Sequence, residues 1–220
     1  MEWFLTRQVA SRTAAIGVVL LLAFFWVAVI VAGSSNPSYS HSRDYISALA
    51  SVGAERPWLG MLALGSVGFA FALTSALVRP FSRTAAIALL IAGIGYIIAS
   101  FARMRCIEGA AFCGVGDRQS TDLENTRGYI HEGAVFGSTL LLVVAMTAFG
   151  IALLRGGRRA GGISSLLAAG ATVVTFALVS GDSPGTEQRI WVVVMMLWTL
   201  SVAVWSIRRA TDTSSPLAAT

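Results

Sequence analysis

The chain has 220 residues, of which 55% are hydrophobic and only 12% carry a charge. Soluble globular domains carry about 25% charged residues, so this composition excludes an ordinary soluble fold. The formal net charge is +5. The positions of the arginines make this charge a signal of membrane topology and of contact with anionic lipid, and we expect no nucleic-acid partner.

Strongly apolar stretches follow one another along the chain, and each is about long enough to cross a bilayer as a helix. They predict six transmembrane helices, at about residues 14–33, 58–78, 84–102, 129–154, 162–180 and 190–207. The fold class is therefore expected to be all-α, a polytopic six-helix membrane bundle that forms one domain over residues 1–209. The Thr-, Ser- and Ala-rich residues 210–220 are predicted to be a disordered tail.

The connections between these stretches alternate in charge, which predicts the orientation of the protein. One side is almost entirely basic and holds Arg7, Arg12, Arg79, Arg83, Arg155, Arg158, Arg159, Arg208 and Arg209. The opposite side holds nearly all the acidic residues. Both termini are therefore predicted to be cytoplasmic in a multi-pass protein of the plasma membrane. The three longer loops would lie outside, where loops on a rigid scaffold usually carry function.

The first outward loop has the most informative polar pattern. Ser40 or Ser42 is expected to cap a short helix that runs to Val52 and lies at the membrane interface or in the mouth of the bundle. One face of that helix would present a polar stripe made of His41, Asp44, Ser47 and Ser51. A stripe that only faces water is the alternative interpretation.

Two ionisable residues, His131 and Glu132, open the fourth apolar stretch. Ionisable groups at membrane depth are costly and usually face a cavity or a partner. Arg103 ends the third stretch and Arg189 opens the sixth at the same level. We predict that these side chains meet the Asp44 region in one recess. Ion pairs, Asp44 with Arg103 or Glu132 with Arg189, are the structural alternative.

The second outward loop contains both cysteines of the chain, Cys106 and Cys113. Six residues separate them, which is enough to close a small loop, and an extracytoplasmic compartment is oxidising. A structural disulfide is the prediction, with free thiols or metal ligands as the alternatives. Two cysteines alone do not have the ligand spacing of a zinc site.

Several short motifs resemble the domain of unknown function 998 family. They are Tyr39-Ser40, the run from Asp44 to Leu49, Pro57-Trp58, the charged end of the third stretch, His131, and Arg189-Ile190-Trp191. The resemblance covers nearly the whole chain and implies a six-helix integral membrane protein of bacterial or archaeal type. It singles out Asp44, Ser47, Arg103, His131 and Arg189 but implies no particular reaction.

Three functional hypotheses remain open. The first is binding of a lipid or amphiphile headgroup in an outer polar pocket, in a role such as envelope maintenance or transport assistance. Its ligand-binding residues would be Asp44, Ser47, Arg103, His131, Glu132 and Arg189. The arginines would hold a phosphate or carboxylate group. Membrane lipids would then be the partners.

The second hypothesis is an accessory or structural subunit that binds another membrane protein or a second copy of this chain. The third is an intramembrane hydrolase, in which Ser47, His131 and Asp44 serve as nucleophile, base and orienting group. In a variant of the third, His41 and His131 help Asp44 and Glu132 to hold a metal ion that activates water. We expect no cofactor and favour the non-enzymatic hypotheses, because no catalytic motif is present.

Overall fold

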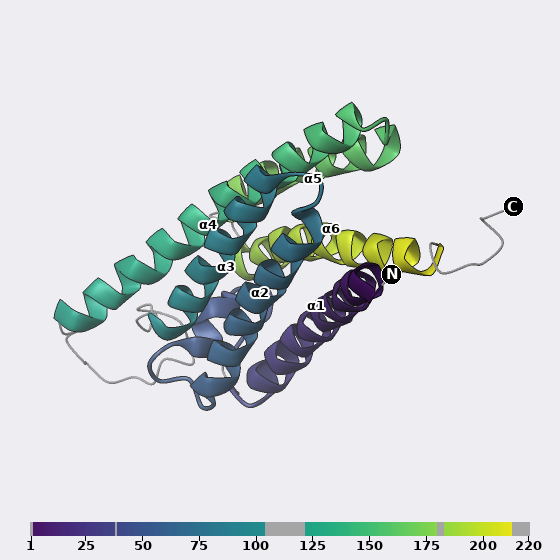
Figure 1. The fold of residues 1–220 in the computed structure, drawn as a ribbon. Coiled ribbons are helices and arrows are strands. Elements are labelled where there is room, and N and C mark those ends of the chain that lie inside the picture. Colours follow the sequence, from purple (N-terminus) through teal and green to yellow (C-terminus); the bar gives the residue numbers. More distant parts are fainter. Residues whose placement is uncertain (1, 38, 104–121, 180–182, 213–220) are drawn as a thin grey trace, which may run out of the picture.

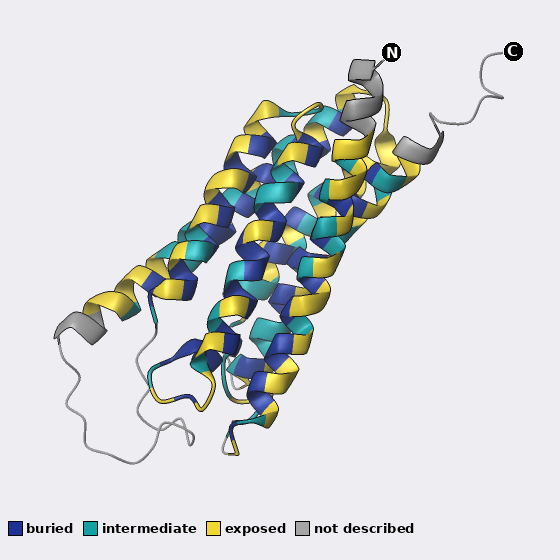
Figure 2. Cartoon of the chain, turned by 60° about the horizontal axis from the view of Figure 1, so that its bottom comes forward, coloured by how far each residue is buried: buried dark blue, intermediate teal, exposed yellow. Residues whose placement is uncertain are grey.

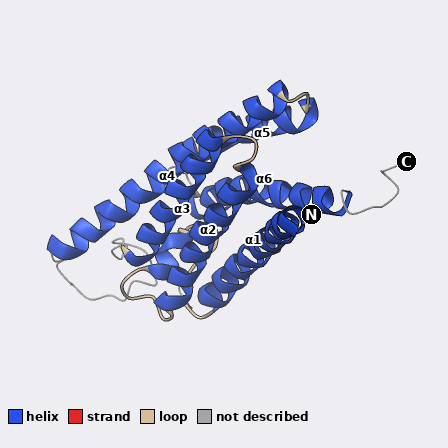
Figure 3. Ribbon diagram, viewed as in Figure 1, coloured by secondary structure: helices blue, strands red, loops and turns tan. Residues whose placement is uncertain are grey.

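The computed structural model describes residues 2–37, 39–103, 122–179 and 183–212, and of residues 2–8, 122–125 and 210–212 it gives the helical backbone alone. This part of the chain is helical almost throughout (Figures 1 and 3). Its elements are α1 (Glu2–Ser34), the 3-10 helix η1 (Ile46–Ala50), α2 (Pro57–Val78), α3 (Arg83–Phe101), α4 (Asp122–Arg155), α5 (Arg159–Ala177) and α6 (Pro184–Asp212). The predicted six-helix, all-α fold is confirmed, and the described residues form no strand.

All six long helices are apolar and long enough to cross a membrane. Large apolar side chains also cover the outside of the bundle, for example Leu20, Phe69 and Leu167, which are 64%, 57% and 69% exposed. Exposed and buried residues therefore alternate around each helix, although both are apolar (Figure 2). Such a surface is stable in lipid and not in water, so the protein is a multi-pass membrane protein.

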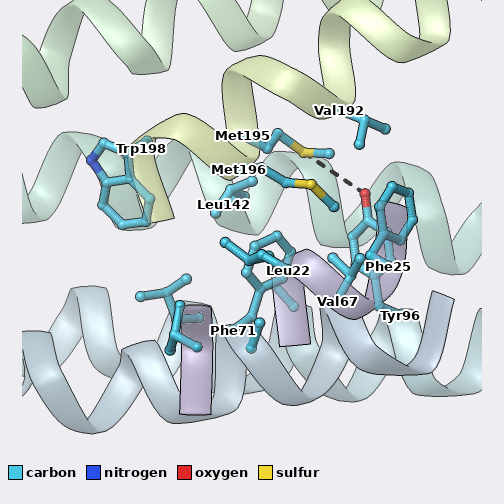
Figure 4. Close-up of a cluster of buried hydrophobic side chains, with 14 of the residues drawn as sticks. Leu22, Phe25, Val67, Phe71, Tyr96, Leu142, Val192, Met195, Met196 and Trp198 are labelled. Atoms are coloured by element: carbon cyan, nitrogen blue, oxygen red, sulfur yellow. Dashed lines mark hydrogen bonds between the residues drawn. The ribbon is translucent and has the colours of Figure 1, made fainter. Parts of the chain in front are cut away.

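Consecutive helices form antiparallel neighbours from α1 to α5, and α6 packs against α1, α2 and α5. Small residues allow the closest approaches: a methyl group on Gly68 would lie 2.6 Å from the carbonyl oxygen of Gly93, which joins α2 tightly to α3. The core between α2, α3 and α6 holds Phe71, Tyr96 and Met195. The Tyr96 hydroxyl donates to the Met195 sulfur at 3.7 Å (Figure 4).

The bundle has two different ends. We call the end that carries η1 and the first turns of α4 and α6 the η1 end. The opposite end carries the α2–α3 and α4–α5 turns and the two terminal helices' outer ends, and we call it the hairpin end (Figure 2). The η1 end corresponds to the predicted outward side, and the orientation in the membrane stays a prediction.

The helix of the first loop differs from the prediction. It covers Ile46–Ala50 alone, it is a 3-10 helix, and all five of its residues are buried. The chain does not begin this helix at Ser40 because the Asp44 carboxylate accepts a hydrogen bond from the Ser40 backbone N–H at 2.6 Å, which closes a turn instead. The predicted polar stripe at the membrane interface is therefore wrong, and η1 is an internal element.

The long helices extend beyond the predicted spans. Helix α1 begins at Glu2, α4 begins at Asp122, and α6 continues to Asp212, so residues 210–212 are helical. Residues 213–220 lie outside the described part of the chain, and the disordered tail stays a prediction. Cys106 and Cys113 also lie outside it, so the disulfide is not tested.

Candidate functional site

A cavity of about 360 Å³ lies inside the η1 end of the bundle. Its wall is mostly apolar and comes from α1, α2, α4, α5 and α6: Phe25, Leu64, Val67, Val135, Phe136, Phe176, Val179, Trp191, Val192 and Met195, with Ile46 of η1. Its polar lining residues are Tyr45, Ser47, Tyr96, His131, Glu132 and Gln188. Glu132 and Phe136 are exposed, so the cavity opens beside α4.

His131 is the most constrained polar residue of this cavity. It is 3% exposed, and its Nδ1 lies 2.8 Å from the Ala99 carbonyl oxygen and 3.1 Å from that of Ala102. These carbonyls belong to the last turn of α3, where a helix leaves its acceptors unpaired. Because a carbonyl only accepts, Nδ1 carries the hydrogen. In the neutral ring Nε2 is then an acceptor, and no other described residue binds it.

Two further polar groups of the cavity have no partner among the described residues. The Trp191 side chain is 2% exposed, and its Nε1–H makes no hydrogen bond. Ser47 is 5% exposed, and no described residue bonds to its hydroxyl. A buried polar group without a partner costs about 1–3 kcal/mol. The Trp191 Nε1–H is covered by surrounding atoms, so the unbonded groups that the cavity offers to a bound molecule are the Ser47 hydroxyl and the His131 Nε2 acceptor.

The start of η1 is held over this cavity by α6 and by the residues that follow α5. The Gln188 Oε1 accepts a hydrogen bond from the Ile46 backbone N–H at 2.5 Å. The Tyr45 hydroxyl donates to the Val179 carbonyl at 3.4 Å. Burial and the negative charges of Glu187 and Glu132 raise the pKa of Tyr45, so its hydroxyl stays a donor. These bonds make η1 a fixed wall of the cavity.

Arg189 binds the first loop and does not line the cavity. Its Nη1 donates to the carbonyl oxygens of His41, of Asp44 at 3.2 Å and of Gly185 at 2.7 Å. Its Nη2 donates to the Tyr39 hydroxyl and lies 3.0 Å from His41 Nδ1. Burial raises the pKa of Tyr39, although the adjacent guanidinium opposes this shift. Arg189 is thus a structural clamp between the loop and α6.

Arg103 has a similar structural role at the other side of η1. Its Nε donates to the Ala50 carbonyl at 3.1 Å and its Nη2 to the Ser51 carbonyl at 2.9 Å. Both carbonyls lie where the 3-10 helix ends, and that of Ser51 also accepts from the Ala54 backbone N–H at 3.4 Å. Asp44 binds the Ser40 N–H, so the alternative ion pair of Asp44 with Arg103 does not form. Arg103 and Arg189 thus both donate to backbone carbonyl oxygens.

The single predicted recess is therefore divided in two. Ser47, His131 and Glu132 line one cavity, and their role in ligand binding stays a prediction. The other four candidates do not line it: Asp44, Arg103, Arg189 and His41. The carbonyl oxygens and backbone N–H groups of the irregular first loop form hydrogen bonds with the side chains of Asp44, Arg103 and Arg189, which are therefore already bonded within the protein.

The catalytic hypotheses lose part of their geometry. The His131 Nδ1 is bound to the Ala99 and Ala102 carbonyls, so Asp44 is not the orienting group that a triad requires. Ser47 and His131 still share the cavity. In the described residues, no three His, Cys, Asp or Glu side chains are grouped closely enough to hold a metal ion.

Four lining residues were not singled out from the sequence as a site: Tyr45, Tyr96, Gln188 and Trp191. Trp191 belongs to the Arg189-Ile190-Trp191 motif, so a signal was present. Tyr45 belongs to the first-loop motif, where its apolar ring gave no reason to prefer it. A single Gln188 or Tyr96 has no recognisable pattern, because their positions follow from the packing of helices distant in the sequence.

A family model described as "Protein of unknown function (DUF998)" matches residues 19–205. The chain belongs to the DUF998 family. This confirms the resemblance seen in the short motifs. The DUF998 match extends over every residue that lines the cavity, from Phe25 to Met195. No curated protein and no solved structure matches the chain.

Proposed function

We propose that this DUF998 protein binds an amphiphile in the cavity of the η1 end. The hydrocarbon chain would occupy the apolar wall, and the polar head would contact His131, Ser47 and Glu132. The observation that carries the proposal is a mostly apolar cavity whose few polar lining groups include the buried His131, with its acceptor Nε2, and the buried Ser47 hydroxyl, to which no described residue bonds. Its volume of about 360 Å³ falls within the range of small-molecule sites, about 300 to 1,000 Å³.

The polar groups of the cavity favour a head that donates hydrogen bonds. His131 Nε2 and the Glu132 carboxylate are acceptors, and no arginine lines the cavity. The sequence suggested that Arg103 and Arg189 would hold a phosphate or carboxylate, but their N–H groups bind carbonyls. A hydroxyl or ammonium head therefore fits this lining better than an anionic one.

The open side of the cavity suggests entry from the membrane. Beside Glu132, the first turns of α4 expose Tyr129, Ile130 and Phe136 by 75%, 47% and 52%. An amphiphile in the lipid layer next to α4 would reach the cavity without crossing η1. If the η1 end faces outward, the ligand comes from the outer leaflet, which suits a role in envelope maintenance or transport assistance.

Probes that share one chain and differ in the head test this proposal. Native mass spectrometry of the detergent-purified protein would count bound dodecylamine, dodecanol and dodecyl phosphate. We expect the amine and the alcohol to bind at least about tenfold more tightly than the phosphate, because the cavity offers acceptors and no cation. Equal binding of all three would contradict the proposed head chemistry.

A substitution that fills the cavity tests whether the probe binds there. Val135→Phe places a larger ring in the cavity and should lower dodecylamine binding by about tenfold or more. Leu140→Phe, on the same helix, is the control, because Leu140 is 51% exposed and does not line the cavity. If Val135→Phe and Leu140→Phe bind the probe equally, the hydrocarbon chain of the probe does not occupy the η1-end cavity.

A hydrolase is the second candidate, because Ser47 and His131 line the same cavity. A fluorophosphonate probe that labels the wild type but not the Ser47→Ala variant would support it. Absence of Ser47-dependent labelling, with amphiphile binding intact, would leave binding as the function.

A further inference from the structure

A second and larger cavity, of about 710 Å³, lies at the hairpin end between α4, α5 and α6. Its depth is apolar, formed by the buried side chains of Phe149, Leu153 and Val202 among others. It is distinct from the η1-end cavity, because the two cavities share no lining residue.

The two buried polar side chains in the wall of this cavity, Trp198 and Ser165, satisfy each other, and the serines Ser164 and Ser201 are exposed. The Trp198 Nε1–H donates to the Ser165 hydroxyl at 2.9 Å, and that hydroxyl donates to the Met146 carbonyl at 2.7 Å. The depth of the cavity thus offers only apolar contacts, which suit a hydrocarbon chain. This differs from the η1-end cavity, where polar atoms lack partners.

The mouth of the hairpin-end cavity is positively charged. Arg158 and Arg159 line it and are exposed, and no carboxylate is among its lining residues. These two arginines begin helix α5, at its N-terminal positions. The positive end of the helix dipole therefore adds to their charge and favours an anion.

Aromatic rings orient the guanidinium groups at this mouth. The Arg158 guanidinium carbon lies 5.2 Å from the centre of the Phe81 ring and 5.8 Å from that of Trp205. Arg209 approaches the same two rings, at 5.1 and 4.8 Å. Two like charges are thus held close together. Stacking on a ring uses the face of a guanidinium and leaves its N–H edge for the oxygens of an oxyanion.

We propose that the hairpin end binds an anionic phospholipid. Its phosphate would bind Arg158 and Arg159, and one acyl chain would enter the apolar cavity behind them. The apolar depth favours a lipid over a free phosphate ion, because a free ion would leave the cavity empty. The predicted cytoplasmic side of the membrane carries anionic lipid, and the charge of the mouth is complementary to it.

Native mass spectrometry of the full-length protein tests this site with phosphatidylglycerol and phosphatidylcholine of identical acyl chains. We expect the wild type to retain phosphatidylglycerol about tenfold more strongly. The double variant Arg158→Gln/Arg159→Gln should lose this preference. The double variant Arg79→Gln/Arg83→Gln is the control, because it removes the same charge at the same end from residues that do not line the cavity. An equal loss of the phosphatidylglycerol preference in both double variants would mean that the lipid is attracted by surface charge in general, and it would overturn the proposed site.

A second variant tests the contribution of the acyl chain of the lipid apart from that of its phosphate head. Ala168→Phe fills the cavity and leaves both arginines in place, so it should also lower phosphatidylglycerol retention. Millimolar inorganic phosphate should not displace the lipid, whereas displacement would assign the arginines to a free phosphate group and overturn the lipid. Val135→Phe, in the other cavity, should leave the preference unchanged, so this test does not depend on the proposed function.

Discussion

At the η1 end of the bundle, Arg103 and Arg189 direct their N–H groups to backbone carbonyl oxygens. At the hairpin end, Arg158 lies against the rings of Phe81 and Trp205 and lines the mouth of a cavity. The difference follows from the backbone beneath them. The long irregular first loop turns carbonyl oxygens toward the two arginines, which bind them.

The hairpin turns satisfy their own backbone. In the α4–α5 turn the N–H groups of Gly156, Gly157 and Arg158 bind the carbonyls of Ala152, Leu154 and Leu153 at 2.9–3.0 Å. The carbonyls of Ala152, Leu153 and Leu154 thus have backbone donors and need no arginine side chain. An arginine at membrane depth is therefore structural beside an irregular loop, and it is available to an external anion beside a tight turn.

The largest effect expected from this comparison is on stability. Arg189→Met removes hydrogen bonds from a charged donor to several loop oxygens and should lower the free energy of unfolding by about 3 kcal/mol. Arg158→Met removes only exposed ring contacts and should cost about 1 kcal/mol or less. Unfolding of both variants in a denaturing detergent, followed by tryptophan fluorescence, measures the two values. Equal losses would remove the distinction between a clamp and a binding arginine.

The helices themselves were predictable from the sequence because their apolar length is a local property. All six predicted spans lie within observed helices or extend past them by only a few residues. The short helix of the first loop was misplaced because Ser40 and Asp44 also favour turns, and a side-chain bond between them decides which forms. Helix starts such as Asp122 were missed, because polar first turns beyond the membrane carry no apolar pattern.

The site was predictable in part, and for the same reason. Ser47, His131 and Glu132 line one cavity, and the sequence pointed to all three because they are polar residues expected at one membrane depth. The roles of Arg103 and Arg189 depend on where the loop places its carbonyl oxygens. Those positions come from the tertiary packing of η1 on α2, which no local pattern encodes.

A smaller effect is expected from glycines at the two ends. The η1 segment rests directly on Gly60, where a methyl group would lie 2.6 Å from the Leu49 carbonyl oxygen. Gly60→Ala should therefore displace η1, lower stability by about 2 kcal/mol, and weaken dodecylamine binding because Ser47 moves with η1. Gly157 has φ of +75° and no atom within 4 Å of an added methyl group. Gly157→Ala should cost about 1 kcal/mol, from backbone conformation alone. If both variants bind the probe like the wild type, η1 is not a wall of the site.

The smallest effect separates the two ends by pH. Burial and the nearby Arg189 charge lower the pKa of His41 from 6.5. The unfolded chain therefore takes up this proton at a higher pH than the folded protein, and stability falls as pH drops below about 6.5. The wild type should lose more thermal stability than His41→Gln between about pH 7.5 and about pH 5, measured by tryptophan fluorescence. Both histidines of the chain, His41 and His131, belong to the η1 end, so phosphatidylglycerol retention at the hairpin end should stay constant over the same range. A pH-dependent loss of that lipid would mean that the two ends are coupled through the bundle.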